Sequence, residues 1–289
     1  MEKRLLNKKH PKPGMIKEQV IQKPGSITLG LPELWQHREL LYYFAWRDIK
    51  VKYKHTAIGI LWAIIQPLGL MLIFYFLFSK GLNVKPVSMS YPLFSLAGLT
   101  IWMFFSGSVV GAGNSMEANY RIIQKIYFPR LIIPLSSIVA ALFDLLWTLL
   151  LLILLGIFVG ENVNWARMFF CIPLAVAIVS AAAFGLGAAF SALSILYKYF
   201  KYALPFLIQV LFFASPVIYD ASMLKSGSWW SSLLEWNPVS GSMSLFRCFL
   251  NEAPIPWESI FKSAVSSTFL LIMGIITFRK IENSMADLS

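Results

Sequence analysis

The chain has 289 residues, of which 57% are hydrophobic and 13% charged, and its mean hydropathy is +0.66. A soluble domain carries about twice that charged fraction, so the composition excludes a soluble globular protein. The net charge of +11 does not indicate nucleic-acid binding, because 12 of the 25 Lys and Arg residues precede residue 55 and flank the first apolar run. Basic residues in that position set membrane topology and contact anionic lipids. We therefore expect an integral membrane protein whose partners include membrane lipids and no nucleic acid.

No pattern of residues in the sequence points to catalysis or to a cofactor. It contains no GxxxxGK[ST] phosphate-binding loop, no GxSxG and no HExxH, and its three His residues all lie within the first 55 positions. Cys171 and Cys248 lack the CxxC spacing of metal and redox sites. They would form a disulfide if their helices meet on the outer side of the membrane, but two buried thiols are the alternative that we favour. We expect no catalytic residue, metal or cofactor in this chain.

The first 55 residues divide into two parts. Residues 1–30 are rich in Lys, Gln, Pro and Gly, a composition that buries too little apolar surface to fold alone, so we expect a mobile cytosolic tail. Pro32 suits the first turn of a helix, and from there to Lys54 polar residues form a stripe with aromatic residues beside it. This pattern is typical of a helix that lies in the membrane interface. The sequence predicts an amphipathic interface helix over residues 31–55.

Six apolar runs follow, each long enough to cross the hydrocarbon core as a helix, which takes about 20 residues. They cover residues 56–79, 91–116, 131–159, 165–196, 202–219 and 259–278. In the fourth run, the small residues between Ser180 and Ala189 permit close packing of helices inside a bilayer. We predict an all-α integral membrane protein with six transmembrane helices in a domain of residues 56–280, followed by a cytosolic tail at 281–289.

The charges between the runs predict the orientation. With both termini in the cytosol, all but six of the 25 Lys and Arg residues lie on the cytosolic side, as the positive-inside rule requires. Residues 221–250 then lie on the outer side, and their apolar pieces of about ten residues suit re-entrant helices rather than spans. We predict two short outer gate helices there, broken at an Asn-Pro step. Their candidate residues are Trp229, Trp236, Asn237 and Pro238.

A basic amphipathic segment, residues 119–128, separates the second and third runs. Arg121 and Lys125 lie one helical turn apart, and isoleucines cover a neighbouring face, which is the pattern of a helix that docks on another protein. Pro129 is expected to end this helix, because it cannot continue the backbone hydrogen bonds. We expect a soluble partner to bind here. The candidate contact residues are Asn119, Tyr120, Arg121, Ile122, Gln124, Lys125, Tyr127 and Arg130.

Asp144 is the one ionisable residue well inside an expected span. A carboxylate in hydrocarbon is costly, so this side chain should face the protein interior, with either a functional role or a structural hydrogen bond to a neighbouring helix. The sequence shows no Lys or Arg at matching depth to pair with it. Both interpretations of Asp144 therefore stay open.

Aromatic residues make up 15% of the chain, and many fall within the apolar runs. Aromatic faces pack against the C–H faces of sugar rings, so these residues suit a path for a glycan. For any single residue, packing in the core or against lipid is the interpretation that we favour. The candidates for a glycan path are Trp62, Tyr75, Trp102, Phe105, Phe212 and Phe213.

Five segments together resemble the membrane subunit of ABC-2 type exporters, specifically the permeases for O-antigen, teichoic acid and related polysaccharides. In chain order they are residues 39–54, 59–67, 126–130, 213–219 and 236–238. The resemblance implies a homodimer in the bacterial inner membrane, bound to a separate cytosolic ATPase subunit that uses ATP and Mg. A lipid-linked polysaccharide would pass along the dimer interface.

The same resemblance implies roles for three segments. Residues 119–128 are similar to the coupling helix that docks in the ATPase, and residues 221–250 are similar to the outer gate helices. Residues 34–54 are similar to the interface helix of the family. The candidate residues of that helix are Trp35, Arg38, Arg47 and Lys50.

Other functions fit parts of the pattern. An ABC-2 exporter of small lipophilic compounds or lipids would share the architecture. A membrane enzyme of polysaccharide or lipid assembly would need the close pair of carboxylates that this sequence lacks. A passive channel or a structural anchor would leave the basic segment after the second run without a role.

Overall fold

The computed structural model describes residues 31–54, 59–83, 89–161, 163–197, 199–219, 234–250 and 254–286. Within these ranges every regular element is a helix and no residue lies in a strand, which confirms the predicted all-α fold. The expected tail at residues 1–30 and the candidate gate residue Trp229 lie outside the described residues.

The helices follow the apolar runs closely. They are α1 (Leu31–Gln36), α2 (Arg38–Lys54), α3 (Gly59–Phe74), the π-helical η1 (Tyr75–Gly81), α4 (Tyr91–Ala118), α5 (Tyr120–Ile123), α6 (Ile132–Val159), α7 (Trp165–Leu196), α8 (Phe200–Phe213), α10 (Ser240–Arg247) and α11 (Trp257–Ala286). The expected interface helix is thus two helices, interrupted at His37. The last helix runs on to Ala286, through most of the residues that we assigned to a tail.

Five of these elements are long and apolar enough to cross a membrane: α3 together with η1, α4, α6, α7 and α11. The expected fifth run, residues 202–219, forms the shorter apolar helix α8 of 14 residues. It stops at Phe213 because Pro216 has no backbone N–H and disfavours a helical residue before it. The described residues therefore contain five candidate spans and one shorter apolar helix, where the sequence predicted six spans.

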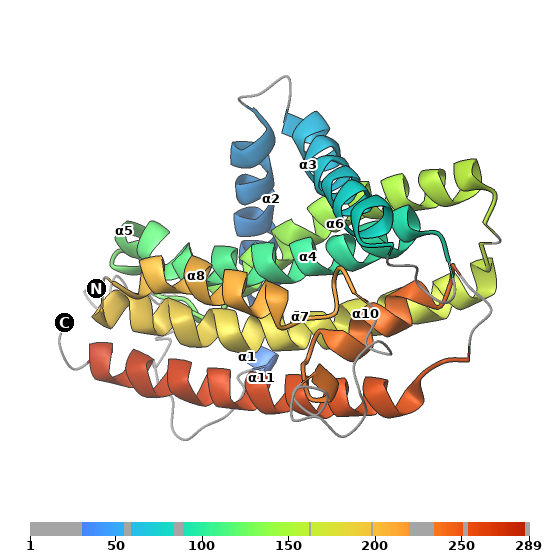
Figure 1. The fold of residues 1–289 in the computed structure, drawn as a ribbon. Coiled ribbons are helices and arrows are strands. Elements are labelled where there is room, and N and C mark those ends of the chain that lie inside the picture. Colours follow the sequence, from blue (N-terminus) through green and yellow to red (C-terminus); the bar gives the residue numbers. More distant parts are fainter. Residues whose placement is uncertain are drawn as a thin grey trace, which may run out of the picture.

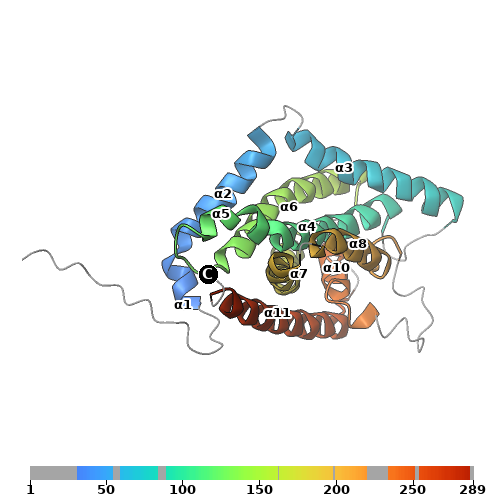
Figure 2. The same ribbon diagram turned by 90° about the vertical axis from the view of Figure 1, so that its left-hand side faces the viewer.

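The long helices form a bundle around α4. In Figure 1, α4, α6, α7, α8 and α11 run lengthwise, α2 crosses them at a steep angle, and α3 slants away from them. The end-on view in Figure 2 places α4 and α7 in the middle of the bundle. In the most apolar stretch of α4, 78% of the residues are buried. In the corresponding stretch of α3 and η1, only 11% are buried. The core is therefore built on α4.

The small-residue run of α7 allows two neighbouring helices to approach it closely. A Cβ atom on Gly185 would overlap the backbone of Leu270 in α11, and one on Gly274 of α11 would overlap the backbone of Gly185. On the other side of α7, a Cβ on Gly187 would lie 2.5 Å from the Cβ of Ala112 in α4. The run therefore packs inside the protein, as its composition predicted.

Both cysteines are buried and neither forms a disulfide. Of the two alternatives, the buried thiols are therefore correct. Among the described residues, no group of three or more His, Cys, Asp or Glu side chains is placed to hold a metal ion.

Gly185→Ala tests the packing of α7 against α11. Because the new methyl group would overlap backbone atoms, one helix must shift, at a cost of about 1–3 kcal/mol. We expect the purified variant to unfold at a lower temperature than the wild type, measured in detergent by intrinsic tryptophan fluorescence. The matched control is Gly69→Ala in α3, where an added Cβ has no neighbour within 4 Å. Equal unfolding temperatures for Gly185→Ala and the wild type would contradict this packing.

Candidate functional site

The segment between α4 and α6 is a short helix followed by a turn. The helix α5 has only four residues, Tyr120–Ile123, whereas the sequence predicted a helix running to Pro129. Hydrogen bonds from Lys125 N and Ile126 N to Ile122 O form a turn directly after it. The chain leaves the helix early because Phe128 turns inwards and is buried beside the ring of Phe44 in α2.

The outward side of this segment is basic and aromatic. Five of the candidate contact residues are exposed, and they are Tyr120, Arg121, Gln124, Lys125 and Tyr127. Ile122 is half-buried against the hydrophobic cluster around Phe128. Nε of Arg130 lies 3.9 Å from Oε1 of Glu282 in α11. The exposed residues form a surface on which another protein can dock, while the rest fix the segment to the bundle.

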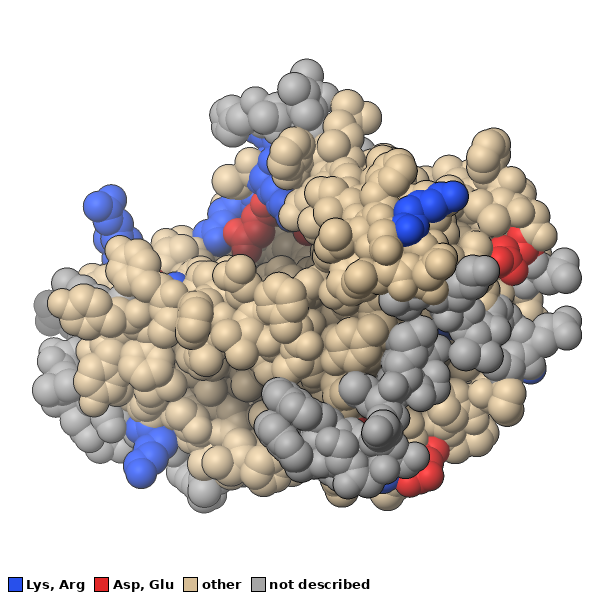
Figure 3. Space-filling view, viewed as in Figure 1, with Lys and Arg blue, Asp and Glu red and all other residues tan. Residues whose placement is uncertain are grey.

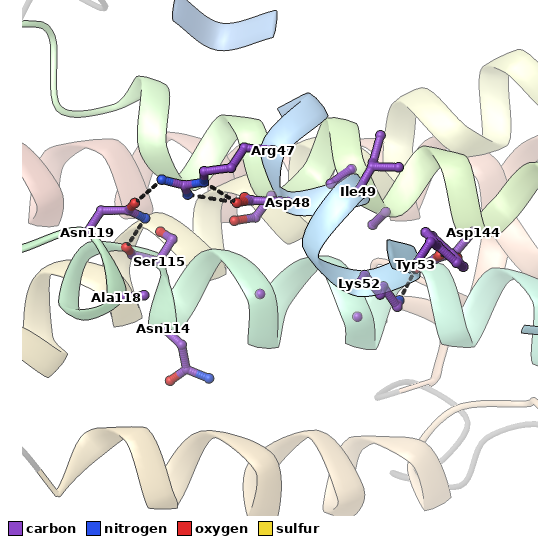
Figure 4. A pocket seen from close by; sticks show the side chains of 15 residues that line it. Arg47, Asp48, Ile49, Lys52, Tyr53, Asn114, Ser115, Ala118, Asn119 and Asp144 are labelled. Atoms are coloured by element: carbon purple, nitrogen blue, oxygen red, sulfur yellow. Dashed lines mark hydrogen bonds and ion pairs between the residues drawn. The ribbon is translucent and has the colours of Figure 1, made fainter. Parts of the chain in front are cut away.

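Asn119 joins this segment to two helices (Figure 4). Only 6% of the residue is exposed. Its Oδ1 accepts a hydrogen bond of 2.7 Å from Nη1 of Arg47 in α2, and its Nδ2 donates to the carbonyl of Ser115 in α4 at 2.8 Å. The guanidinium of Arg47 is also paired with Asp48 and lies over the ring of Phe44. Asn119 is therefore an internal connection between α2 and the end of α4 rather than an exposed contact residue.

Hydrophobic packing supports the same connection. Phe44, Phe128, Ile132 and Phe278 belong to one buried cluster, so α2, the segment before α6, α6 itself and α11 meet at this end of the bundle. The segment is therefore packed against three long helices at once.

Asp144 does have a cationic partner. Its Oδ2 lies 2.5 Å from Nζ of Lys52, and its Oδ1 accepts a hydrogen bond from the hydroxyl of Tyr53 (Figure 4). Both partners belong to α2, which lies outside the spans, and this explains why a comparison of depths within the spans did not find them. Burial, together with the hydrogen bond and negative charge of Asp144, raises the pKa of Tyr53 above its ordinary range. The hydroxyl therefore stays protonated and remains a donor.

A cavity of about 310 Å³ lies between α2, α4 and α6. It is lined by Arg47, Asp48, Ile49, Lys52, Tyr53, Gly107, Gly111, Asn114, Ser115, Ala118, Asn119, Ser137, Ala140, Ala141 and Asp144. Figure 3 shows basic and acidic side chains gathered beside this hollow. The Asn119 and Asp144 contacts lie on the two flanks of the same cavity (Figure 4).

At the opposite end of the bundle, α8 ends and leaves backbone carbonyls without helical partners. Side chains from other segments donate hydrogen bonds to them. The Nδ2 of Asn237 donates to the carbonyl of Ala214 at 3.0 Å, and the hydroxyl of Tyr91 donates to the carbonyl of Ile218 at 3.0 Å. Without such partners, each carbonyl would be costly in a membrane. Asn237 thus has a structural role that its place in an Asn-Pro break did not by itself indicate.

Arg247 completes this junction at the end of α8. It is buried at the end of α10, its Nη2 donates to the carbonyl of Val217 at 2.8 Å, and its guanidinium lies 3.6 Å from the centre of the Phe94 ring in α4. Gly98 leaves the necessary space, because a Cβ there would lie 2.5 Å from both Nη2 and the Val217 carbonyl oxygen. Nothing in the sequence around Arg247 indicates this contact.

Only part of the expected outer gate falls in the described residues. The helix α10 is buried, Trp236 is exposed, and Pro238 lies two residues before Ser240, the first residue of α10. Residues 220–233 lie outside the described part of the chain, so α10 is the one helix of this region that the structure describes, and the pair of re-entrant helices stays a prediction.

The six aromatic candidates for a glycan path do not share one environment. Trp102 and Phe105 are buried and pack against each other, and Phe212 lies against Trp102 with ring centres 5.4 Å apart. By contrast, Trp62 is 59% exposed and Phe213 is 66% exposed, while Tyr75 is half-buried. Trp102 and Phe105 therefore support the protein core.

Comparison with known proteins identifies the family. Residues 39–250 match the family model described as ABC-2 type transporter. The chain belongs to this family. The ABC-2 chain is also similar to curated relatives, and these matches confirm the resemblance drawn from its sequence segments.

Two relatives are named O-antigen export system permease protein RfbA. The one from Klebsiella pneumoniae is 27% identical over 252 residues, covering 86% of this chain and 95% of the relative. The one from Myxococcus xanthus is 28% identical over 240 residues, covering 83% and 91%. A third relative, polysialic acid transport protein KpsM from Escherichia coli, is 27% identical over 235 residues, covering 80% and 86%. The ABC-2 chain thus matches these permeases over most of its length.

Arg247→Met tests the junction at the end of α8 in this ABC-2 chain. The substitution keeps an unbranched side chain but removes the donor to the Val217 carbonyl, which should cost about 1–3 kcal/mol. We expect a lower unfolding temperature in detergent and faster proteolysis after α8, detected by mass spectrometry of the fragments. The control is Lys80→Met, which removes an exposed cation from η1. The role of Arg247 is contradicted if both variants behave alike.

Proposed function

We propose that the chain is the permease subunit of an ATP-driven exporter of lipid-linked polysaccharide in the bacterial inner membrane. It acts as a homodimer, with both termini in the cytosol. The observation that carries the proposal is its similarity, over most of its length, to permeases named for O-antigen and polysialic acid transport. The distribution of Lys and Arg between the apolar runs supports the orientation.

In this proposal, a separate ATPase subunit docks on residues 120–127. The exposed basic and aromatic side chains of that segment support the docking, and the chain itself has no phosphate-binding loop. ATP-driven movement of the ATPase pushes the segment. The push reaches α4 through the hydrogen bond between Asn119 and Ser115, and it reaches α2 through the hydrogen bond between Arg47 and Asn119. The segment and α2 therefore move together.

The outer surface of α1 and α2 suits the membrane interface on the cytosolic side. Arg38 lies over the ring of Trp35 at 5.7 Å, and Lys50 lies over the ring of Trp46 at 5.3 Å. Exposed aromatic rings covered by cations are favoured at the level of lipid headgroups. This arrangement supports α1 and α2 as the interface helix of the transporter.

The sugar chain passes between the two protomers, along aromatic side chains that one protomer leaves exposed. Trp62 of α3 and Phe213 of α8 are the strongest candidates, because each is more than half exposed. Phe212 supports Phe213 from behind, since their rings are in contact with centres 5.4 Å apart.

The double charge reversal Arg121→Glu and Lys125→Glu tests the docking surface. Both side chains are exposed, so the variant should fold and insert normally, but a surface of the wrong charge should weaken binding of the ATPase. We expect at least a tenfold loss of the ATPase that is co-purified with the permease, measured by quantitative pull-down from membranes, together with a loss of polysaccharide export.

Lys80→Glu makes a similar charge change at the far end of the first span and serves as the control. It should retain ATPase binding. Undiminished ATPase binding and export in the Arg121→Glu, Lys125→Glu variant would show that residues 120–127 are not part of the docking surface.

A further inference from the structure

The cavity between α2, α4 and α6 is deep and is lined by charged side chains. It extends from Asn119, at the cytosolic end of α4, to Asp144. Asp144 lies twelve residues after Ile132, the first residue of α6, which corresponds to about 18 Å along the helix axis. A polar ligand can therefore reach well below the membrane surface while it stays inside a charged pocket.

The width of the cavity comes from small residues on two helices. Gly107, Gly111 and Ser115 line it from α4 at intervals of one turn, and Ser137 and Ala140 line it from α6. Because these side chains are small or absent, the space between the helices stays open for a ligand. Among the lining residues, the charged groups come chiefly from α2.

The two cations of the pocket are held by contacts that can be exchanged. The side chain of Lys52 is 61% exposed, and its ammonium group forms an ion pair with Asp144. The guanidinium of Arg47 forms an ion pair with Asp48 and donates a hydrogen bond to Asn119. A phosphate accepts the same charge-assisted hydrogen bonds as a carboxylate. If Lys52 turns to a phosphate, Asp144 still accepts the hydrogen bond from Tyr53 and is not left without a donor.

We propose that this cavity binds the phosphate-bearing head of the lipid carrier, through Arg47 and Lys52. The carboxylate of Asp144 holds Lys52 in place while the pocket is empty and is displaced when the phosphate arrives. The inference rests on the proposed function, because a lipid-linked polysaccharide is the substrate that would bring such a head to the cytosolic end of the bundle. A small phosphate in solution has the same binding chemistry, so the test must separate the two.

The two members of the ion pair should respond in opposite directions. Removing the cation with Lys52→Gln weakens binding of the lipid phosphate, by about tenfold for the loss of one charge-assisted hydrogen bond. Removing the competing anion with Asp144→Asn strengthens it, because Lys52 no longer has to leave a carboxylate. A purely structural ion pair would give changes in the same direction, since either substitution would disturb the same contact.

The experiment measures binding of farnesyl diphosphate to the full-length permease in nanodiscs of phosphatidylcholine, by microscale thermophoresis. Farnesol and inorganic diphosphate are the comparison ligands. The matched control variant is Lys50→Gln, an exposed cation of α2 that does not line the cavity. Arg47→Gln provides a second loss of a cation if Lys52→Gln does not fold, and size exclusion verifies the folding of each variant.

The proposal predicts that farnesyl diphosphate binds, that farnesol does not, and that inorganic diphosphate binds more weakly. Lys52→Gln or Arg47→Gln weakens binding, Asp144→Asn strengthens it, and Lys50→Gln leaves it unchanged. Equal effects of Lys52→Gln and Lys50→Gln, or weakening by Asp144→Asn, would overturn the proposal. Equal binding of inorganic diphosphate would overturn its assignment to a lipid.

Export by the reconstituted permease and ATPase separates this inference from the function on which it rests. A complex that exports lipid-linked polysaccharide, but whose farnesyl diphosphate binding does not depend on the pocket, overturns the inference alone. A complex that binds the diphosphate through the pocket, but exports no polysaccharide, overturns the proposed function instead.

Discussion

The buried side chain of Asn119 is the contact on which one end of the helix bundle depends. It has one amide group, and both ends of that amide are used, one by Arg47 of α2 and one by the carbonyl of Ser115 in α4. An amide buried among apolar residues is costly unless both ends are satisfied, so Asn119 fixes the relative positions of the two helices. The proposed docking segment starts at the next residue. Its exposed face can therefore be pushed without separating from the helices behind it.

At the opposite end of the bundle, buried polar side chains also join separate parts of the chain, here by hydrogen bonds to backbone carbonyls. Where α8 stops, backbone carbonyls lose their helical partners, and a membrane offers no water to replace them. Tyr91 of α4 supplies one of the missing donors, and Asn237 and Arg247 of the α10 segment supply two more. The break after α8 is thereby fixed to α4 and α10 at once. Between the two polar ends, the bundle is held by close helix contacts of the kind seen at Gly185.

The sequence was sufficient for features that depend on local pattern. Apolar length located the spans within a few residues, with α7 matching residues 165–196, and small residues predicted close packing of α7. Pairings across the fold could not be predicted, because hydropathy does not say which helices meet. Lys52 and Asp144 are 92 residues apart, and Arg247 resembled an ordinary loop cation until α10 buried it. The short α5 was also missed, because inward packing of Phe128 outweighed the helical pattern of residues 119–128.

The central claim is that residues 120–127 and α2 move as one body when nucleotide binds to the ATPase. Spin labels at Lys50→Cys and Gln124→Cys, both exposed positions, would measure this by double electron–electron resonance in the permease–ATPase complex. A second pair, Gln124→Cys with Lys80→Cys, reports on movement relative to the far end of the first span. We predict that the first distance is the same with and without ATP while the second one changes. A change in the first distance would contradict the account.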